Sequence, residues 1–269
     1  MKPGGRWLRV YALAYLIFLY APILLLPLFA FNKGTIIAFP LQGFSTQWFE
    51  AMLEQPTLRR AVTNSLIIAV SSAVLATTLG VFAARASTRY AFPAKGPILG
   101  MIMLPLVLPE IIVAVSLLVV LLGLGVNLSI LTVILGHVLI CVPFSIAILN
   151  SAFAALDTSL EEAAIDLGET RLSTFRRITL PLVAPGIISS LLISFTISLD
   201  EFIIAFFLAG TEPTLPVYIF SQFRFPQSVP VIMALGTILV ALSVVLLSIA
   251  EYIRRCGAAR TGTDPGGFL

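Results

Sequence analysis

Six long apolar stretches, none interrupted by a lysine or an arginine, constrain the fold of this chain more than any other feature of its sequence. A helix that crosses a bilayer needs about 20 consecutive, mostly apolar residues. Runs that stay apolar throughout favour helices over the alternating strands of a membrane barrel. The six stretches are Val10–Phe31, Ala61–Ala84, Pro97–Leu122, Asn127–Leu156, Gly186–Gly210 and Val229–Ala250. The sequence therefore predicts an all-α integral membrane protein with six transmembrane helices.

The low charge content leads to the same class of protein. Charged residues make up 11% of the sequence, whereas a soluble domain carries about 25%. With a mean hydropathy of +1.06, most of the surface has to face lipid or other apolar helices. The first stretch is longer than the apolar core of a signal peptide, which predicts a retained helix. We expect one transmembrane domain over residues 1–255 and a disordered cytoplasmic tail over residues 256–269, which are rich in glycine and threonine.

The lysine and arginine residues predict an orientation, because all of them lie outside the six stretches. With the N-terminus in the cytoplasm, twelve of the 16 fall inside and four outside, which matches the positive-inside bias. The four outside residues are Lys33, Arg59, Arg60 and Arg224. Both termini are therefore expected in the cytoplasm. The net charge of +3 follows from this topology and does not indicate a nucleic-acid-binding surface.

The sequence contains no motif for hydrolytic or nucleotide chemistry. A nucleophile elbow, an H-E-x-x-H pair and a G-x-x-x-x-G-K-[ST] loop are all missing, so catalysis and ATP binding are not expected of this chain. Cys141, Cys256 and the single histidine, His137, do not have the spacing of a metal site. No cofactor is expected, and His137 is expected to be a packed, hydrogen-bonded side chain.

The segment 157–185 is the longest polar stretch on the predicted cytoplasmic side, and it holds five of the 13 acidic residues. Ser159 and Glu162 have the spacing of a capping box, which predicts a helix start, and Gly168 is typical of a helix end. The apolar positions of this helix are Leu160, Ala163, Ala164 and Leu167. A second short helix is expected over Ser173–Pro181. On this pattern alone, a solvated amphipathic loop on the membrane surface is an equal alternative.

Four anchors in this segment resemble the EAA signature of ABC importer permeases. Glu162-Ala163-Ala164 is followed by three residues, Gly168, nine residues, and then Ile178-x-Leu180-Pro181. The resemblance covers residues 61–253 and implies a type I ABC importer permease fold with that range as its core. It implies that residues 157–181 form the coupling segment that docks into a groove on an ATPase subunit. The implied coupling residues are Glu162, Ala163, Ala164, Gly168, Ile178, Leu180 and Pro181.

The same resemblance implies the partners and the location of the chain. A permease of this family hydrolyses nothing itself and works with ABC ATPase subunits on the cytoplasmic side. A homologous sister permease and an extracytoplasmic solute-binding protein complete the importer, although the sequence leaves a homodimer open. The implied location is the bacterial inner membrane, surrounded by lipid.

Three shorter segments resemble permeases of the spermidine/putrescine type. These segments are LPLVLPEII at 104–112, GHVLICVPFSI at 136–146 and SLDEF at 198–202. Polyamines are therefore the expected solutes. Permeases for iron(III), thiamine, phosphonates or opines share parts of these segments, so the same importer class for another small solute is the alternative.

Three acidic residues, Glu110, Asp200 and Glu201, lie inside the predicted spans. Placing a charge there costs at least about 2.5 kcal/mol on insertion scales, so such residues face a cavity, a partner or a solute path. A path lined by carboxylates without basic residues attracts polyamines and repels anions. Adjacent helical residues point about 100° apart, so at most one of Asp200 and Glu201 can share the direction of Glu110. A structural role at the sister interface remains the alternative for each acid.

A stand-alone secondary transporter is the competing class of function. It predicts internal repeats and ion-coupling groups within one chain. The two halves of this sequence show no clear repeat, and the EAA-like segment would have no purpose in such a protein. The permease interpretation is therefore preferred.

Overall fold

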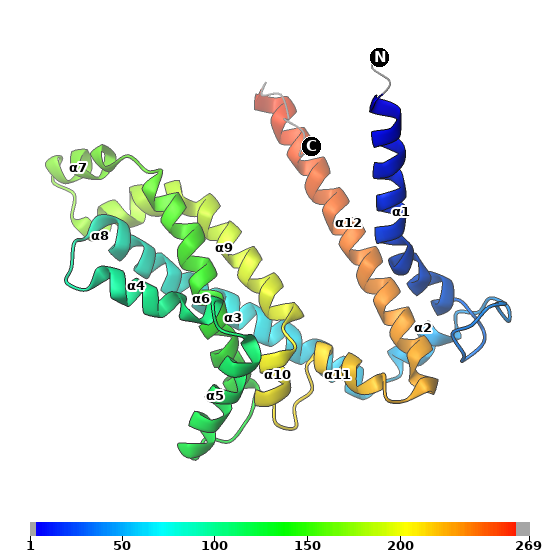
Figure 1. Cartoon of the computed structure of the whole chain (residues 1–269). Coiled ribbons are helices and arrows are strands. Elements are labelled where there is room, and N and C mark those ends of the chain that lie inside the picture. Colours follow the sequence, from blue (N-terminus) through cyan, green and yellow to red (C-terminus); the bar gives the residue numbers. More distant parts are fainter. Residues whose placement is uncertain (1–3, 262–269) are drawn as a thin grey trace. The chain divides into compact units, whose positions relative to one another are not determined.

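The structure, a computed structural model, describes residues 4–261, and the chain divides into two compact units (Figure 1). Unit 1 consists of residues 1–56 and 219–269, and unit 2 consists of residues 57–218. Helices dominate the described residues, and the one extended pairing among them is an isolated bridge between Asn32 and Phe44. The prediction of an all-α protein is confirmed.

Unit 1 is built on two long helices that pack along each other, α1 (Gly4–Ala30) and α12 (Val229–Thr261). The helix α12 also packs on α2 (Gln47–Leu53), and the indole N–H of Trp48 in α2 donates a hydrogen bond of 2.7 Å to the carbonyl of Asn32. The helix α12 includes residues 256–261, which the sequence analysis assigned to a disordered tail. The rest of that predicted tail, 262–269, lies outside the described residues.

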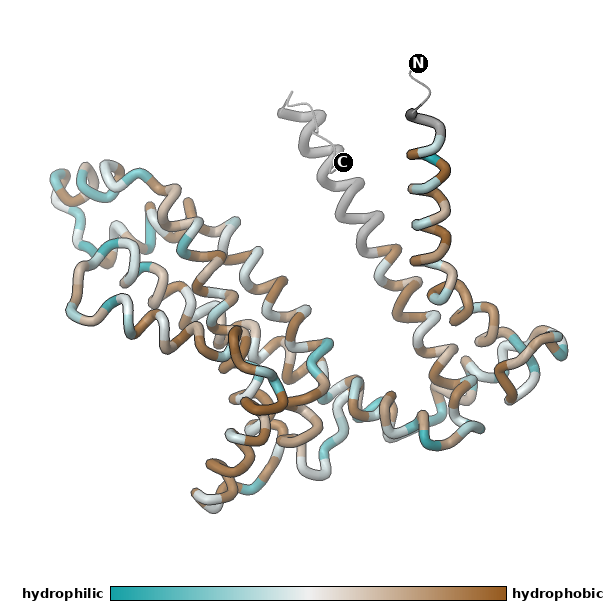
Figure 2. Tube along the Cα trace, viewed as in Figure 1, coloured by the Kyte–Doolittle hydropathy of each residue, from teal (hydrophilic) through white to brown (hydrophobic). Residues whose placement is uncertain are grey.

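Unit 2 contains the central helices of the chain and the polar segment between the fourth and fifth predicted spans. Its elements are α3 (Pro56–Arg89), α4 (Lys95–Met103), η1 (Leu104–Leu106), α5 (Glu110–Gly123), α6 (Ile130–Ala154), α7 (Thr158–Asp166), α8 (Arg171–Thr174), the π turn η2 (Phe175–Thr179), α9 (Leu180–Asp200), α10 (Ile203–Leu208) and α11 (Leu215–Gln222). The long helices are hydrophobic along most of their length, whereas α7 is largely hydrophilic (Figure 2).

Five stretches of the described residues are long and apolar enough to cross a membrane as straight spans, and a bent pair of helices adds a sixth. The straight spans are Trp7–Ala30, Pro56–Arg89, Ile130–Ala154, Arg171–Asp200 and Pro226–Val245, and the bent pair is Lys95–Leu106 with Glu110–Gly123. The predicted number of spans is therefore matched when the bent pair counts as one span.

The third predicted span, Pro97–Leu122, is not one continuous helix. Its two halves meet at an angle of 104°, and the break lies between Leu106 and Glu110. Pro105 and Pro109 flank this break. Because each proline lacks a backbone N–H and its ring clashes with the preceding turn, two of them four residues apart end the first helix and start a new one.

The fifth predicted span, Gly186–Gly210, is displaced in the structure. The helical stretch covers Arg171–Asp200, so it starts 15 residues earlier and ends at an extended residue, Glu201. The prediction followed hydropathy, which marks the part of a helix that suits lipid. This helix continues beyond the apolar run into the polar segment, and α10 follows as a separate short helix.

The core of unit 2 forms where α6 packs along α9 and α10. Small residues allow this close approach: a Cβ on Gly186 would lie 2.5 Å from Cβ of Ala152. Buried hydroxyl and imidazole groups pair across the helices, as is common in membrane interiors. The pairs are Thr77–Ser190 (3.0 Å), Ser145–Ser194 (3.0 Å) and His137–Ser198 (2.7 Å). His137 is thus a buried, hydrogen-bonded side chain, as expected.

Candidate functional site

The helix α7 begins two residues before the position that the capping box predicted. Asp157 is the N-cap, and its carboxylate accepts a hydrogen bond of 2.9 Å from the backbone N–H of Ser159. That hydrogen bond holds the pKa of the Asp157 carboxyl below its usual value. The predicted capping box of Ser159 and Glu162 is therefore wrong. Asp157 is an equally strong N-cap residue two positions earlier, and it places Ser159 inside the helix.

The predicted helix end at Gly168 is confirmed in detail. Gly168 has a φ of +91°, a conformation that glycine adopts without steric cost. Its N–H donates to the carbonyl of Ile165 (2.9 Å), and the N–H of Glu169 donates to the carbonyl of Ala164 (3.0 Å). These two bonds form a Schellman motif, which satisfies the last carbonyls of the helix. The turn then directs the chain back toward the spans.

The second predicted helix, Ser173–Pro181, is not a separate element. Thr170 caps a helix that starts at Arg171 and continues through the π turn η2 into α9, so this half of the segment is the base of a span. The π turn lies just before Pro181, where a wider turn relieves the clash between the proline ring and the carbonyl four residues earlier. Ile178 and Leu180 are half-buried there, and Pro181 is exposed.

The four apolar positions of α7 do not form one buried face. Ala164 is buried, whereas Leu160, Ala163 and Leu167 are exposed, with Leu167 at 87% of its full accessible area. Glu162 is exposed as well. The segment therefore presents an acid, small residues and a large apolar side chain outward.

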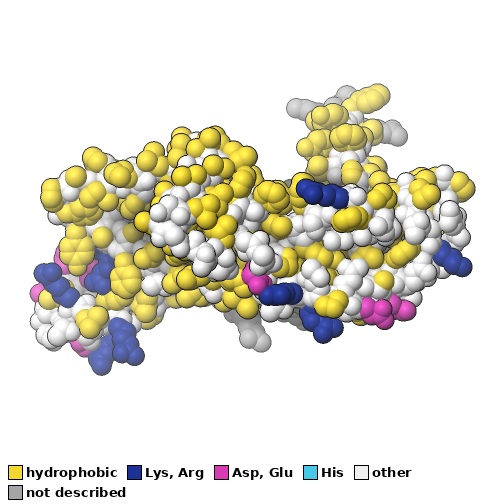
Figure 3. All heavy atoms as spheres, turned by 90° about the horizontal axis from the view of Figure 1, so that it is seen from below, with side chains coloured by type: hydrophobic (Ala, Val, Ile, Leu, Met, Phe, Trp, Pro, Cys, Tyr) yellow, Lys and Arg dark blue, Asp and Glu magenta, His cyan; other side chains and the backbone are white. Residues whose placement is uncertain are grey.

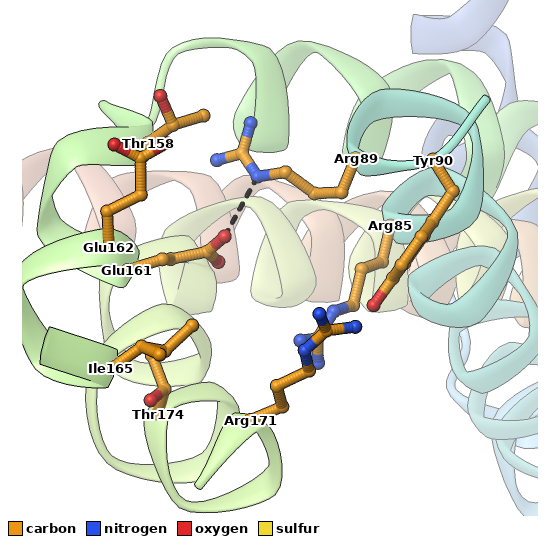
Figure 4. Close-up of a pocket in the computed structure, with 9 residues that line it drawn as sticks. All are labelled: Arg85, Arg89, Tyr90, Thr158, Glu161, Glu162, Ile165, Arg171 and Thr174. Atoms are coloured by element: carbon orange, nitrogen blue, oxygen red, sulfur yellow. Dashed lines mark hydrogen bonds and ion pairs between the residues drawn. The ribbon is translucent and has the colours of Figure 1, made fainter. Parts of the chain in front are cut away.

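A half-buried acid on the opposite face of α7 fastens this helix to the rest of unit 2. Glu161 forms an ion pair of 3.1 Å with Arg89 at the end of α3 (Figure 4). Its other oxygen accepts a hydrogen bond of 2.6 Å from the hydroxyl of Thr179. Arg89 also donates to the carbonyl of Leu156 (3.1 Å). We call Arg89, Glu161 and Thr179 the α7 clamp. It joins α3, α7 and the base of α9.

The sequence analysis missed the α7 clamp. Glu161 lies three residues before Ala164, so the two share a face of the helix. A face defined by Ala164 would have placed Glu161 inward, where a buried carboxylate needs a cationic partner. Arg89 is 72 residues away in the sequence, so the sequence does not indicate which cation pairs with Glu161.

The three acids of the predicted solute path lie where helices break. Glu110 is exposed in the first turn of α5, directly after the 104° bend. Glu201 is buried between α9 and α10, and its carboxylate accepts a hydrogen bond of 2.6 Å from the N–H of Ile204. Asp200 ends α9 and is exposed. Two breaks thus carry all three carboxylates.

The two breaks belong to neighbouring elements. The helices α5 and α10 pack against each other. Because Glu201 has an extended backbone and lies outside α9, the 100° separation of helical neighbours does not apply to it. Which of the two acids shares the direction of Glu110 stays a prediction, and Asp200 is exposed.

Comparison with known proteins gives consistent results. Residues 76–255 match the family described as binding-protein-dependent transport system inner membrane component. The spermidine/putrescine transport system permease protein PotC of Shigella flexneri is 34% identical over 262 residues, 97% of each chain. The putrescine transport system permease protein PotI of Escherichia coli is 37% identical over 255 residues, 92% of this chain and 90% of the relative. A probable molybdenum ABC transporter permease protein of Haloferax volcanii is 35% identical over a shorter range, 171 residues.

Solved structures agree on the fold. A bacterial ABC transporter involved in the import of alginate has a TM-score of 0.72 at 14% identity and covers 95% of this chain and 98% of its own. The MetNI methionine ABC transporter in an inward-facing conformation has a TM-score of 0.58 at 16% identity and covers 79% of this chain and 99% of its own. The family match and the full-length relatives together show that this chain belongs to the binding-protein-dependent transport system inner membrane component family.

Proposed function

We propose that this chain is the permease subunit of an ATP-driven importer of polyamines. The carrying observation is the set of three carboxylates at two neighbouring helix breaks, in α5, α9 and α10, none of which contains a lysine or an arginine. A wholly acidic site favours a cation with several amino groups and repels anions. The names of the PotC and PotI relatives support the same solute class.

The outward face of α7 and the base of α9 form the proposed contact with the ATPase. Its proposed residues are Glu162, Ala163, Ala164, Gly168, Ile178, Leu180 and Pro181. The exposed Glu162 and Leu167 support this role, and the α7 clamp would carry the motion of the ATPase into α3 and α9. Because six of the eight lysine and arginine residues of unit 2 belong to this end (Arg85, Arg89, Lys95, Arg171, Arg176 and Arg177), we place it in the cytoplasm, and the positive-inside bias of the whole sequence places both termini there too.

The remaining partners are a homologous sister permease and an extracytoplasmic solute-binding protein. In this arrangement residues 1–255 act as one permease domain with its core over residues 61–253. One solved relative, the alginate transporter, is described in complex with a periplasmic protein bound to an alginate pentasaccharide, which supports the presence of such a partner here.

Uptake of labelled spermidine and putrescine into vesicles containing this chain and the subunits encoded beside it tests the proposal. We expect ATP-dependent uptake that falls at least tenfold in Glu110→Gln and Asp200→Asn. The matched control is Glu54→Gln, which removes an exposed acid of unit 1 and should transport normally. Molybdate, a phosphonate and an iron(III) chelate serve as alternative solutes. Uptake of one of these without polyamine uptake would keep the importer and reject the acidic path.

A further inference from the structure

A cavity of about 430 Å³ lies between the end of α3 and the segment formed by α7 and α8 (Figure 4). Polar and charged side chains line most of it. They are Arg85, Arg89, Tyr90, Thr158, Glu161, Glu162, Ile165, Arg171 and Thr174. Figure 3 shows basic and acidic side chains gathered at the left end of the view, where the end of unit 2 with α7 and α8 lies, while hydrophobic side chains cover much of the rest of that unit's visible face.

The charges around this cavity are not balanced internally. Arg89 and Glu161 neutralise each other in the α7 clamp. Arg85 lies with its guanidinium carbon 4.0 Å from the centre of the Phe175 ring, an interaction that leaves the charge in place. Among the described residues, neither Arg85 nor Arg171 forms an ion pair. Two guanidinium groups therefore enter one cavity without a counter-ion from this chain.

The side chains converge on one part of the cavity. In Figure 4 the guanidinium groups of Arg85 and Arg171 reach toward each other from α3 and α8, and the hydroxyl of Tyr90 points to the same place. The carboxylate of Glu162 lies on the far side, beside Thr158, and points away from these groups. The cavity thus presents donors that face one another, an arrangement that an anion between them stabilises.

We propose that this cavity binds a phosphate group through three of its lining residues, Arg85, Arg171 and Tyr90. Each guanidinium offers a planar pair of N–H donors that matches two phosphate oxygens. A phenol adds a third donor. The volume of about 430 Å³ also accommodates the glycerol part of a phospholipid headgroup.

The position of the cavity favours the headgroup of an anionic phospholipid as the source of the phosphate. Arg85 directly follows the apolar stretch Ala61–Ala84 of α3, and Arg171 lines the same cavity. Side chains at span ends lie at headgroup level, where long basic residues meet lipid phosphates. Basic pockets between transmembrane helices on the cytoplasmic side bind such headgroups. Free phosphate is the second possible source.

Native mass spectrometry of the full chain in detergent, titrated with phosphatidylglycerol, tests this site. We expect one lipid to be retained in a saturable manner. Arg171→Gln and Arg85→Gln should each weaken retention about tenfold, because each removes charged hydrogen bonds. Arg176→Gln is the matched control: it removes the same charge from an exposed position of the same segment, outside the cavity, and should retain the lipid as the unmodified chain does. Thermal unfolding of each variant shows that it is folded.

A second titration with inorganic phosphate distinguishes the sources. If inorganic phosphate displaces the bound lipid, or if phosphate binds and the lipid does not, the site is supported and free phosphate is identified as a ligand. Lipid binding that phosphate leaves unchanged supports the headgroup. The proposal is overturned if neither ligand binds saturably, or if Arg176→Gln weakens binding as much as Arg171→Gln. It is also overturned if Arg171→Gln impairs only the binding of the ATPase subunit, since the cavity would then receive a protein carboxylate.

Discussion

The helix α3 carries an ion pair at each end, and the two pairs differ in their surroundings. Near its start, Arg60 pairs with Glu212, and the two side chains are 63% and 25% exposed. At its other end, Arg89 pairs with Glu161, and the side chains are only 12% and 15% exposed. Water screens the first pair more strongly than the second, although Arg89 and Glu161 also line a cavity beside α7. The same chemistry therefore has a small effect on stability at one end and a large effect at the other.

The supporting hydrogen bonds sharpen this difference. Beside Arg60, Asn64 donates to Glu212 (3.3 Å) and to the carbonyl of Pro213 (2.9 Å). The loop before α11, which contains Glu212 and Pro213, therefore stays attached to α3 without the ion pair. In the α7 clamp, the hydroxyl of Thr179 donates to Glu161 and the carbonyl of Leu156 accepts from Arg89, so both supporting hydrogen bonds depend on the two charged groups. Loss of either charge leaves the other buried. The α7 end of α3 is therefore the end at which a single substitution should disrupt both stability and coupling.

The largest effect is expected from Arg89→Met. This change keeps an unbranched stem, leaves the Glu161 carboxylate without its cation, and should lower the free energy of unfolding by about 2 to 3 kcal/mol, less than for a fully buried pair because both side chains stay partly exposed. We expect the thermal midpoint of the chain in detergent to fall by about 5 °C or more. ATP-dependent uptake should fall further than the loss of folded protein explains.

The control for this prediction is Arg177→Met. Arg177 pairs with Glu169 at 3.1 Å in the same segment, but these side chains are 73% and 38% exposed. Its loss should change the free energy of unfolding by less than about 1 kcal/mol. Equal effects of Arg89→Met and Arg177→Met would show that burial does not distinguish the pairs.

A smaller effect is expected from Gly168→Ala. An added Cβ has nothing within 4 Å, so the cost comes only from the φ of +91°, about 1 to 2 kcal/mol for a side chain in a left-handed conformation. Strain there should loosen the end of α7 and lower coupled uptake, and Gly168→Asn should recover part of the loss because asparagine tolerates this conformation. Gly96→Ala, equally open but without a positive φ, should have no such effect. A normal uptake rate for Gly168→Ala would contradict a role for this turn in coupling.

The sequence predicted the elements of this end of the molecule better than their connections. Hydropathy found the apolar part of every span, and the EAA-like spacing located α7 and its end at Gly168. Hydropathy does not detect a bend, so the two halves of the third span were joined across Pro105 and Pro109. It also does not detect a helix that leaves the bilayer, so the start at Arg171 was missed. The pairing of Glu161 with Arg89 depends on packing between distant segments, which a single sequence does not contain.

Acidification should weaken the start of α7 through Asp157. Its pKa is lowered in the folded chain, so the stabilisation that it contributes is complete above the ordinary carboxyl pKa of 3.8 and is lost as the pH falls through the lower, folded value. Hydrogen exchange of the first α7 amides should therefore be faster in Asp157→Ala than in the unmodified chain at neutral pH, and the difference should disappear in strong acid. Asp157→Asn, which keeps an N-cap acceptor, should stay close to the unmodified chain throughout. A difference that persists in strong acid would assign the effect to something other than the carboxylate.

The smallest effect is expected from Arg60→Met, and it decides whether the two ends of α3 really differ. Because Arg60 is largely exposed and Asn64 still binds the loop, the free energy of unfolding should change by less than about 1 kcal/mol. Raising the salt from about 0.05 M to about 0.5 M should remove most of that difference, because the shorter Debye length screens the attraction between these two exposed charges. The Arg89→Met effect should be less sensitive to salt, because the side chains of this pair are only 12% and 15% exposed. If Arg60→Met proved as costly as Arg89→Met, or equally insensitive to salt, then the loop before α11 would be held as tightly as α7. Motion transmitted from α7 through the α7 clamp would then reach an end of α3 that is itself held rigidly.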